Sequence, residues 1–131
     1  MPSVSSLDHL VLTVADLDAA VAFYSEVLGM EARSFTPEGG EPRTALHFGL
    51  QKLNLHVAGK EFEPKAQTPQ PGSADLCFLS ANSLKNWQVH LANHGVKVEE
   101  GPVRRTGATG PIDSLYVRDP DGNLVEIATR A

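Results

Sequence analysis

Apolar and polar positions follow two different spacings along the first half of the chain. Residues 7–14 are rich in aliphatic and β-branched side chains after a polar start, which predicts a strand. Over residues 17–28 the apolar positions recur at helical spacing, after Asp16 as a candidate N-cap and before Gly29 as a candidate stop. Three further strands are predicted over residues 30–35, 43–48 and 52–57. The first half is therefore expected to be β-α-β-β-β.

The segment 59–73 interrupts this pattern. It contains three prolines, and a connection of this length is uncommon in a compact domain unless it joins two units. After it we predict a strand over residues 74–80 and a helix that begins at Asn82 or Ser83 and ends at Gly95. The remaining strands are predicted over residues 96–99, 112–118 and 124–128. The β-α-β-β-β pattern thus occurs twice.

The second half repeats the start of the first at an offset of 66 residues, and its last strand has a longer offset that sets Asn54 against Glu126. The offset holds for the first polar residue of the strand, for the helix cap and for the helix stop. These pairs are His9 and Asp75, Asp16 and Asn82, and Gly29 and Gly95. We therefore predict a single domain of two similar units, over about residues 4–58 and 74–130, joined by a linker over 59–73.

Composition limits the possible partners and surroundings. The chain has 131 residues, enough for one domain with a substantial core, and a net charge of −5 without any block of Lys or Arg. Nucleic acid is therefore not expected as a partner. The single cysteine, Cys77, excludes an internal disulfide, and no apolar run has the length of a membrane span or a signal segment. We expect a cytoplasmic protein with no membrane partner.

The last strand carries an unexpected charge. Residues 119–123 read Asp-Pro-Asp-Gly-Asn, which is turn chemistry throughout, so the chain is predicted to reverse there. The strand after it is apolar except for Glu126, and a carboxylate in that position faces solvent, faces a polar cavity or binds a cation. His9 lies in a similar strand near the other end of the chain. The two side chains are candidates for one site across a sheet.

Three segments carry a family resemblance, together with the tandem β-α-β-β-β units: residues 8–14 (Asp-His-Leu-Val-Leu-Thr-Val), 20–30 and 119–127. They resemble the vicinal oxygen chelate superfamily, which contains glyoxalase I, methylmalonyl-CoA epimerase, the extradiol dioxygenases and the fosfomycin and bleomycin resistance proteins. The chain is most similar to bacterial glyoxalase-domain virulence-type proteins, through residues 52–56, 71–78 and 105–110. The resemblance implies an α+β fold in which two β-α-β-β-β units form a curved eight-stranded mixed sheet with a concave cavity.

The resemblance also implies a divalent metal in that cavity, bound from the first and fourth strands of each unit. His9 and Glu126 match the superfamily's ligands in place and type. Asp75 stands where the second unit commonly supplies His, and Asn54 stands where the first unit commonly supplies Glu or Gln. His56 shares a strand face with Asn54 and is the stronger ligand type. We therefore predict that His9, His56 and Glu126 bind Fe, Mn, Ni or Zn, with Asn54 as the alternative third ligand and a solvent-bound side chain as the alternative for His56.

Further residues near these ligands are candidates for chemistry. Glu126 or Asp75 would transfer a proton beside the metal. Tyr116 precedes Glu126 by ten residues, as the acid-base tyrosine of the extradiol dioxygenases does, and strand alternation places it on the same side as Arg118. Core packing is the alternative for Tyr116.

Residues 101–111 are predicted to form a flexible loop over the cavity, because three glycines and two prolines interrupt the strand pattern. Arg104 and Arg105 lie in this segment. With Arg118 on the next strand, they are candidates to bind a carboxylate or phosphate of the substrate. The alternative for each is a solvated charge.

Three functions are compatible with these residues. The first is a metal-dependent lyase or isomerase of the glyoxalase type, acting on a small oxygenated substrate that is chelated through neighbouring oxygens. The second is a ring-cleaving extradiol-type dioxygenase, which Tyr116 favours and Asp75 disfavours. The third is a non-catalytic drug-binding protein, which needs no metal. We expect an enzyme, and a homodimer, because the half-open sheet of a short chain usually needs a second copy to cover it.

Overall fold

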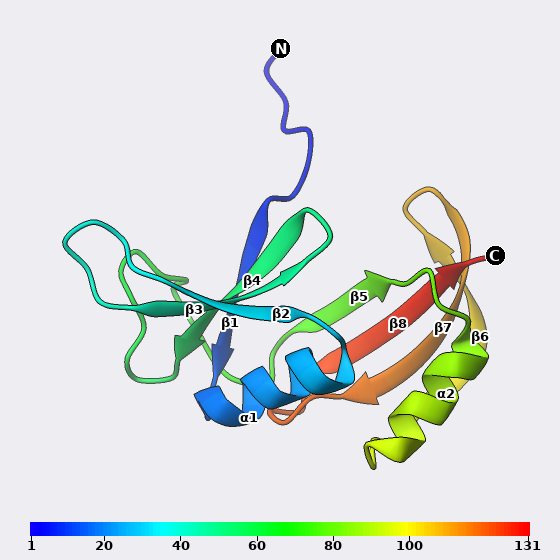
Figure 1. Ribbon diagram of the computed structural model, residues 1–131. Helices are drawn as coiled ribbons and strands as arrows, with labels where there is room; N and C mark the ends of the chain where they lie inside the picture. Colours follow the sequence, from blue (N-terminus) through cyan, green and yellow to red (C-terminus); the bar gives the residue numbers. More distant parts are fainter. The chain divides into compact units, whose positions relative to one another are not determined.

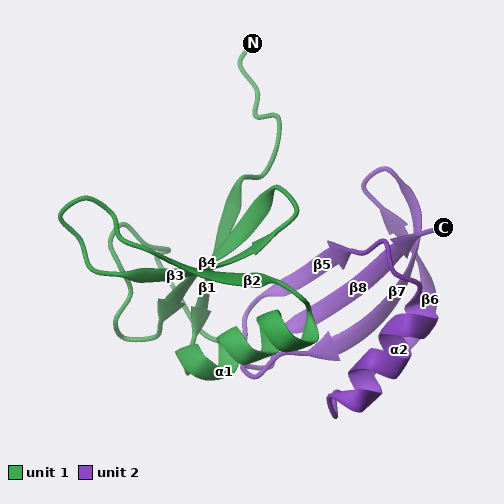
Figure 2. Cartoon of the chain, viewed as in Figure 1, with its two compact units in different colours: residues 1–71 green, residues 72–131 purple.

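The computed structural model describes residues 1–131, which form two compact units, residues 1–71 and 72–131 (Figure 2). Each unit has four strands and one helical region in the order β-α-β-β-β, so the predicted α+β repeat is confirmed (Figure 1). The division falls inside the predicted linker 59–73. None of the helices combines the length and the apolar character that crossing a membrane requires.

Unit 1 has a mixed four-stranded sheet of order β1-β4-β3-β2. Its elements are β1 (His9–Val14), α1 (Leu17–Ala22), the π-helical turn η1 (Phe23–Val27), β2 (Glu31–Phe35), β3 (Arg43–Phe48) and β4 (Gln51–Val57). Strand β1 runs parallel to β4, and the other neighbours are antiparallel. The Asp16 side chain caps α1 by accepting a hydrogen bond from the Ala19 N–H at 3.0 Å. The predicted helix over 17–28 is therefore confirmed as α1 continued by η1.

Unit 2 repeats this arrangement with the order β5-β8-β7-β6. Its elements are β5 (Asp75–Leu79), α2 (Leu84–Asn93), β6 (Glu100–Gly107), β7 (Gly110–Arg118) and β8 (Leu124–Arg130). Strand β5 is parallel to β8, while β7 is antiparallel to both β6 and β8. The eight strands thus form two four-stranded mixed sheets, one in each unit.

The repeat of 66 residues holds for the strand starts and helix stops but not for the cap. Strands β1 and β5 begin 66 residues apart. Gly29 and Gly95 both have positive φ, which suits a residue without a Cβ at the end of a helix. The cap of α2 is Ser83, whose hydroxyl accepts a hydrogen bond from the Asn86 N–H at 3.2 Å, and not Asn82.

The hairpin of unit 2 differs from the sequence prediction. The segment 96–99, predicted as a strand, precedes β6, and most of the predicted loop 101–111 belongs to the antiparallel ladder of β6 and β7. Pro102 does not break the ladder, because it lies where a bulge shifts the register. Gly107 allows the tight closure, since a Cβ there would lie 2.8 Å from the Gly110 carbonyl oxygen. The prediction of a loop over these residues is therefore wrong.

Alternation along the strands separates a core face from an open face in the unit 2 sheet. Val125 and Ile127 of β8 are buried, as are Leu115 and Val117 of the neighbouring β7. Helix α2 contacts β7. Glu126 lies between two of these buried residues and therefore points to the opposite, open face.

Candidate functional site

The turn over residues 119–123 determines where β8 begins. The buried Asp119 carboxylate accepts hydrogen bonds from the Asn123 side-chain amide at 2.7 Å and from the Asn123 and Asp121 N–H groups at 2.9 Å each. The Asn123 amide oxygen accepts a hydrogen bond from the Ala74 N–H at 2.8 Å, directly before β5. The turn therefore sets the register of β8 against its neighbours.

Glu126 stands in a row of polar side chains across the open face of this sheet. It pairs in register with Cys77 on β5 and with Tyr116 on β7, so the three side chains leave the same face. The Ser114 hydroxyl donates a hydrogen bond to the Glu126 carboxylate at 2.5 Å. None of the ion pairs of the chain includes Glu126. This half-buried carboxylate is therefore outside any ion pair, although the charge of Arg105 lies near enough to interact with it.

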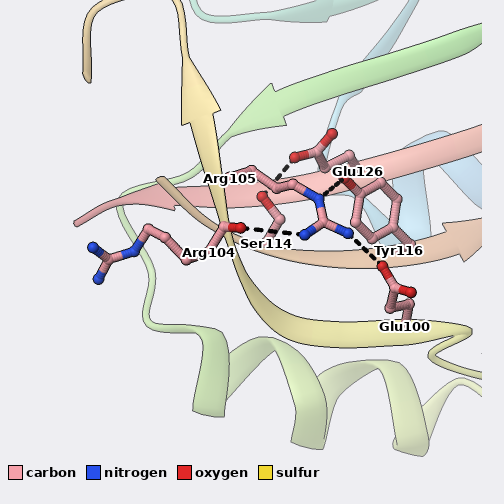
Figure 3. A network of polar contacts seen from close by, with 6 residues as sticks. All are labelled: Glu100, Arg104, Arg105, Ser114, Tyr116 and Glu126. Atoms are coloured by element: carbon pink, nitrogen blue, oxygen red, sulfur yellow. Dashed lines mark hydrogen bonds and ion pairs between the residues drawn. The ribbon is translucent and has the colours of Figure 1, made fainter. Parts of the chain in front are cut away.

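Arg105 joins this row from the edge strand β6 (Figure 3). Its Nε donates to the Tyr116 hydroxyl at 3.0 Å, and its Nη groups donate to the Glu100 carboxylate at 2.5 Å and to the Arg104 carbonyl oxygen at 3.2 Å. The bond to Tyr116 is the main cause that raises the pKa of Arg105. Because the Tyr116 oxygen accepts this bond, its own proton is available to donate toward the open face.

These side chains line a cavity of about 420 Å³ in unit 2, a size typical of small-molecule sites. One part of the wall holds Glu126, Tyr116 and Cys77. The rest comes from the β6–β7 hairpin and the ends of β5 and β8, through Leu79, Arg105, Thr106, Gly107, Ala108, Thr109, Ile112 and Arg130. The cavity therefore contains one carboxylate, one phenol, one thiol and two guanidinium groups.

Cys77 contributes a protonated thiol to this wall. Partial burial raises the pKa of the Cys77 thiol to about 11, and the neighbouring Glu126 carboxylate adds to the increase. A thiol with a raised pKa is a weak nucleophile at neutral pH, so Cys77 contributes a hydrogen-bond donor to the wall.

Three residues predicted for the site lie outside this cavity. Arg104 leaves the opposite side of β6 and forms an ion pair with Asp113 at 2.7 Å. Arg118 shares the open face but is held by Glu99, with Nη2 and Oε2 3.0 Å apart. Asp75 is exposed at the start of β5. The structure therefore brings Arg105, and not Arg104 or Arg118, to the cavity with Glu126.

In unit 1, His9 is oriented by its neighbour. The His9 Nδ1 lies 2.8 Å from the Asp8 carboxylate, in an exposed pair. A carboxylate partner makes Nδ1 the donor and leaves the lone pair of Nε2 for a cation, as at many metal-binding histidines. The first predicted ligand therefore has a suitable ring orientation.

The register of β1 and β4 distinguishes the two candidates for a third ligand. His9 pairs with Lys52, so Asn54 lies two residues further along the sheet and His56 lies four. At about 3.3 Å per residue, His56 is roughly 13 Å along the sheet from His9, whereas Asn54 is roughly 7 Å away. The Asn54 side-chain oxygen is buried without a hydrogen-bond partner, which suits an acceptor that binds a cation or a donor. Register and burial favour Asn54 over His56 as the companion of His9.

His56 belongs instead to a packed cluster. Its ring lies 5.6 Å from the ring of Phe62, and the Arg43 guanidinium lies 4.1 Å from the same Phe62 ring. Burial, followed by the charge of Arg43, lowers the pKa of His56. A cavity of about 230 Å³ beside it is lined by Thr13 and Lys65, among others. His56 is buried but lines this cavity, so its role as a ligand or as a solvent-bound histidine stays a prediction.

The metal prediction joins residues of both units. Neither unit by itself gathers three His, Cys, Asp or Glu side chains placed to hold a metal ion. Each unit does present donor types that divalent cations bind: the His9 imidazole and the Asn54 amide oxygen in unit 1, and the Glu126 carboxylate in unit 2. The set His9, His56 and Glu126 stays a prediction.

Two residues in or beside the unit 2 cavity were assigned no role from the sequence: Arg130 lines the cavity, and Ser114 bonds to Glu126 without lining it. Ser114 holds Glu126, and Arg130 lies on the same strand face four residues after Glu126. The alternation used to place Glu126 also places Arg130 on that face. Strand alternation could therefore have identified Arg130 from the sequence, but the predicted strand ended at residue 128, two residues too early.

Comparisons with known proteins agree with this architecture. The family model described as the Glyoxalase/Bleomycin resistance protein/Dioxygenase superfamily matches residues 6–127. The glyoxalase domain-containing protein RDO1 of Mycosarcoma maydis is 58% identical over 97% of this chain and 69% of its own length. The virulence protein STM3117 of Salmonella typhimurium is 51% identical over 95% of this chain and 84% of its own length. The structure of the integron cassette protein VCH_CASS1 of V. cholerae matches with a TM-score of 0.94 and 54% identity, covering 100% of this chain and 99% of that one.

Proposed function

Since this chain belongs to the glyoxalase/bleomycin resistance protein/dioxygenase superfamily, we propose that it is a divalent-metal-dependent enzyme of the glyoxalase type. Its substrate would be a small molecule with neighbouring oxygens. The observation that carries the proposal is Glu126, a half-buried carboxylate on a cavity wall that accepts a hydrogen bond from the Ser114 hydroxyl and forms no ion pair. A partly buried carboxylate outside any ion pair costs free energy, so we expect Glu126 to bind a cation or to accept and release a proton.

The residues that would hold the cation are His9, Asn54 and Glu126. Fe, Mn, Ni and Zn suit imidazole and carboxylate ligands. When bound, such an ion polarises the oxygens of the substrate. Asp8 would keep the His9 ring in the tautomer that exposes Nε2.

The side chains around Glu126 serve proton transfer. Tyr116 lies directly opposite Glu126 in the ladder and presents a proton toward the cavity, because Arg105 occupies its oxygen. Ser114 restrains the Glu126 carboxylate through the bond to Oε2, and the carboxylate would bind a cation or a proton on its cavity side. Glu126 and Tyr116 thus form an acceptor and donor pair on one wall.

The proposal is tested by the metal content of protein purified without added metal or chelator. We expect about one divalent ion per chain in the wild type and loss of the ion in His9→Ala and Glu126→Gln. Asn54→Ala should lose most of it, while His56→Ala should retain it, because His56 lies too far along the sheet from His9. Asp8→Asn should weaken binding about tenfold. Circular dichroism must first show that each variant is folded.

The outcomes separate the alternatives. Full metal occupancy in His9→Ala would refute the site. Loss in His56→Ala with retention in Asn54→Ala would restore the set predicted from the sequence. Wild-type protein that stays metal-free at full metal supply, and carries an aromatic ligand, would instead indicate a drug-binding protein.

A second candidate function is ring-cleaving dioxygenation. It is favoured by Tyr116, which lines the same cavity as Glu126 and is fixed by Arg105. Iron as the bound element, with oxygen uptake on a catechol, would favour it. Turnover of a 2-oxoaldehyde thiol adduct without oxygen uptake would favour the glyoxalase type.

A further inference from the structure

Two arginines flank one apolar residue on the floor of the unit 2 cavity. Ile112 of β7 pairs with Arg105 on one side and with Arg130 on the other, so the three side chains leave the same face in one row. The two arginine backbones are about 10 Å apart, which is two strand spacings. Both side chains line the cavity.

Arg130 differs from the other arginines of unit 2 in its partner. Arg104, Arg105 and Arg118 are each paired with a carboxylate. Arg130 donates through Nη1 to the Thr109 hydroxyl, which is neutral, and no ion pair includes it. A guanidinium has five N–H donors, so most of those on Arg130 have no protein acceptor.

The cavity therefore has oppositely charged ends. Glu126 lies four residues before Arg130 on β8, roughly 13 Å along the strand, and the residues between them on this face are small or apolar. Glu126 repels an anion, with part of its charge offset by the nearby Arg105, and Arg130 attracts an anion at the other end. Hydroxyls of Thr106 and Thr109 line the same end as additional donors.

We propose that Arg130, assisted by Arg105 and Thr109, binds an oxyanion of the substrate, either a carboxylate or a phosphate. The substrate of this chain is then a small acid, whose charged group anchors it at the hairpin while its neighbouring oxygens lie toward Glu126 and Tyr116. Arg105 has donors left after its three bonds, and its fixed guanidinium contributes positive potential without having to move. This inference rests on the proposed function for the Glu126 end of the cavity.

The test is an NMR titration of ¹⁵N-labelled protein with inorganic phosphate and, separately, with propionate, each against chloride at constant ionic strength. We expect saturable shifts of amides over residues 105–112 and of the Arg130 Nε–H. Saturation by phosphate alone assigns a phosphate ester, and saturation by propionate alone assigns a carboxylic acid.

The variants make the test specific. Arg130→Gln should weaken anion binding at least tenfold. Arg130→Lys should weaken it less, because lysine keeps the positive charge but lacks the two parallel N–H donors of the guanidinium. Arg33→Gln is the matched control, since Arg33 is also an exposed arginine and its loss changes the net charge equally. Shifts that do not saturate, or that are unchanged in Arg130→Gln, would overturn the inference.

The titration needs neither metal nor turnover. Its failure would therefore leave the metal proposal standing, and metal-free wild-type protein would sink the proposed function while leaving anion binding intact. Once a substrate is turned over, Arg130→Gln should raise KM much more than it lowers kcat, because Arg130 does not contact the reacting atoms.

Discussion

Replacing Asn123 by Ala tests whether the turn before β8 holds Glu126 in place. The buried Asn123 side chain donates to the Asp119 carboxylate at 2.7 Å and accepts from the Ala74 N–H at 2.8 Å. Alanine removes both bonds and leaves one oxygen of Asp119 and the Ala74 N–H without these partners. Since the turn sets the start of β8, the row of Glu126, Tyr116 and Cys77 depends on it.

The magnitude follows from the two bonds. A hydrogen bond to a charged group contributes about 1.5–3 kcal/mol, and a neutral one contributes about 1 kcal/mol. Together they give a loss of about 3 kcal/mol in the free energy of unfolding. This is a large part of the roughly 5–15 kcal/mol that stabilises a typical domain.

Urea unfolding followed by the fluorescence of Trp87 measures the effect. Trp87 is the only tryptophan and lies in α2, so its signal reports on unit 2. The matched control is Asn86→Ala, in which an exposed asparagine of the same helix is removed, and we expect a change within about 0.5 kcal/mol. A loss below about 1 kcal/mol in Asn123→Ala, with the control unchanged, would refute the role assigned to the turn.

Three other predictions follow from the structure. Burial and the charge of Arg43 lower the pKa of His56 in the folded chain below its value in the unfolded chain. As the pH falls, the unfolded chain therefore binds the proton first. The free energy of unfolding should be constant above about pH 6.5 and decrease below it. His56→Gln should show a smaller fall in melting temperature between pH 7.5 and 5.5, and equal falls would contradict this. Amides of β6 that bond to β7 should exchange slowly with deuterium, and rapid exchange over residues 103–107 would instead support the loop expected from the sequence. Sedimentation at micromolar concentration should show a homodimer, because β1 and β5 are edge strands with one side unpaired, and a monomer would exclude it.

Sequence patterns predicted the structure correctly where the requirement is local, as at the end of a helix or along a single strand. Asp16 and Gly29 bound a helix because a cap and a positive φ are local requirements, and both occur as expected. Glu126 could be assigned to the open face because its neighbours on β8 are apolar and strands alternate. These inferences needed no knowledge of the partners across the sheet.

The sequence was uninformative where the pairing of strands or the partner of a side chain determines the structure. Pro102 and the glycines after it indicate a loop by local rules, yet pairing with β7 makes β6 a strand and places the proline at a bulge. The same pairing sends Arg104 to Asp113 and Arg105 to Tyr116, a distinction that the dipeptide alone does not contain. The choice between Asn54 and His56 likewise required the parallel register of β1 and β4.

The two units differ in the size of one side chain on the open face of the sheet. The registers of β1 with β4 and of β5 with β8 align Asn54 with Glu126, which sets His56 against Ala128. In unit 1 the imidazole of His56 packs against Phe62, and the neighbouring cavity is about 230 Å³. In unit 2 the corresponding side chain is a methyl group, and the cavity between Glu126 and Arg130 is about 420 Å³. Ala128 lies between Glu126 and Arg130 on the same strand face and is fully buried, so a larger side chain there is expected to disturb the wall that the proposed substrate would span.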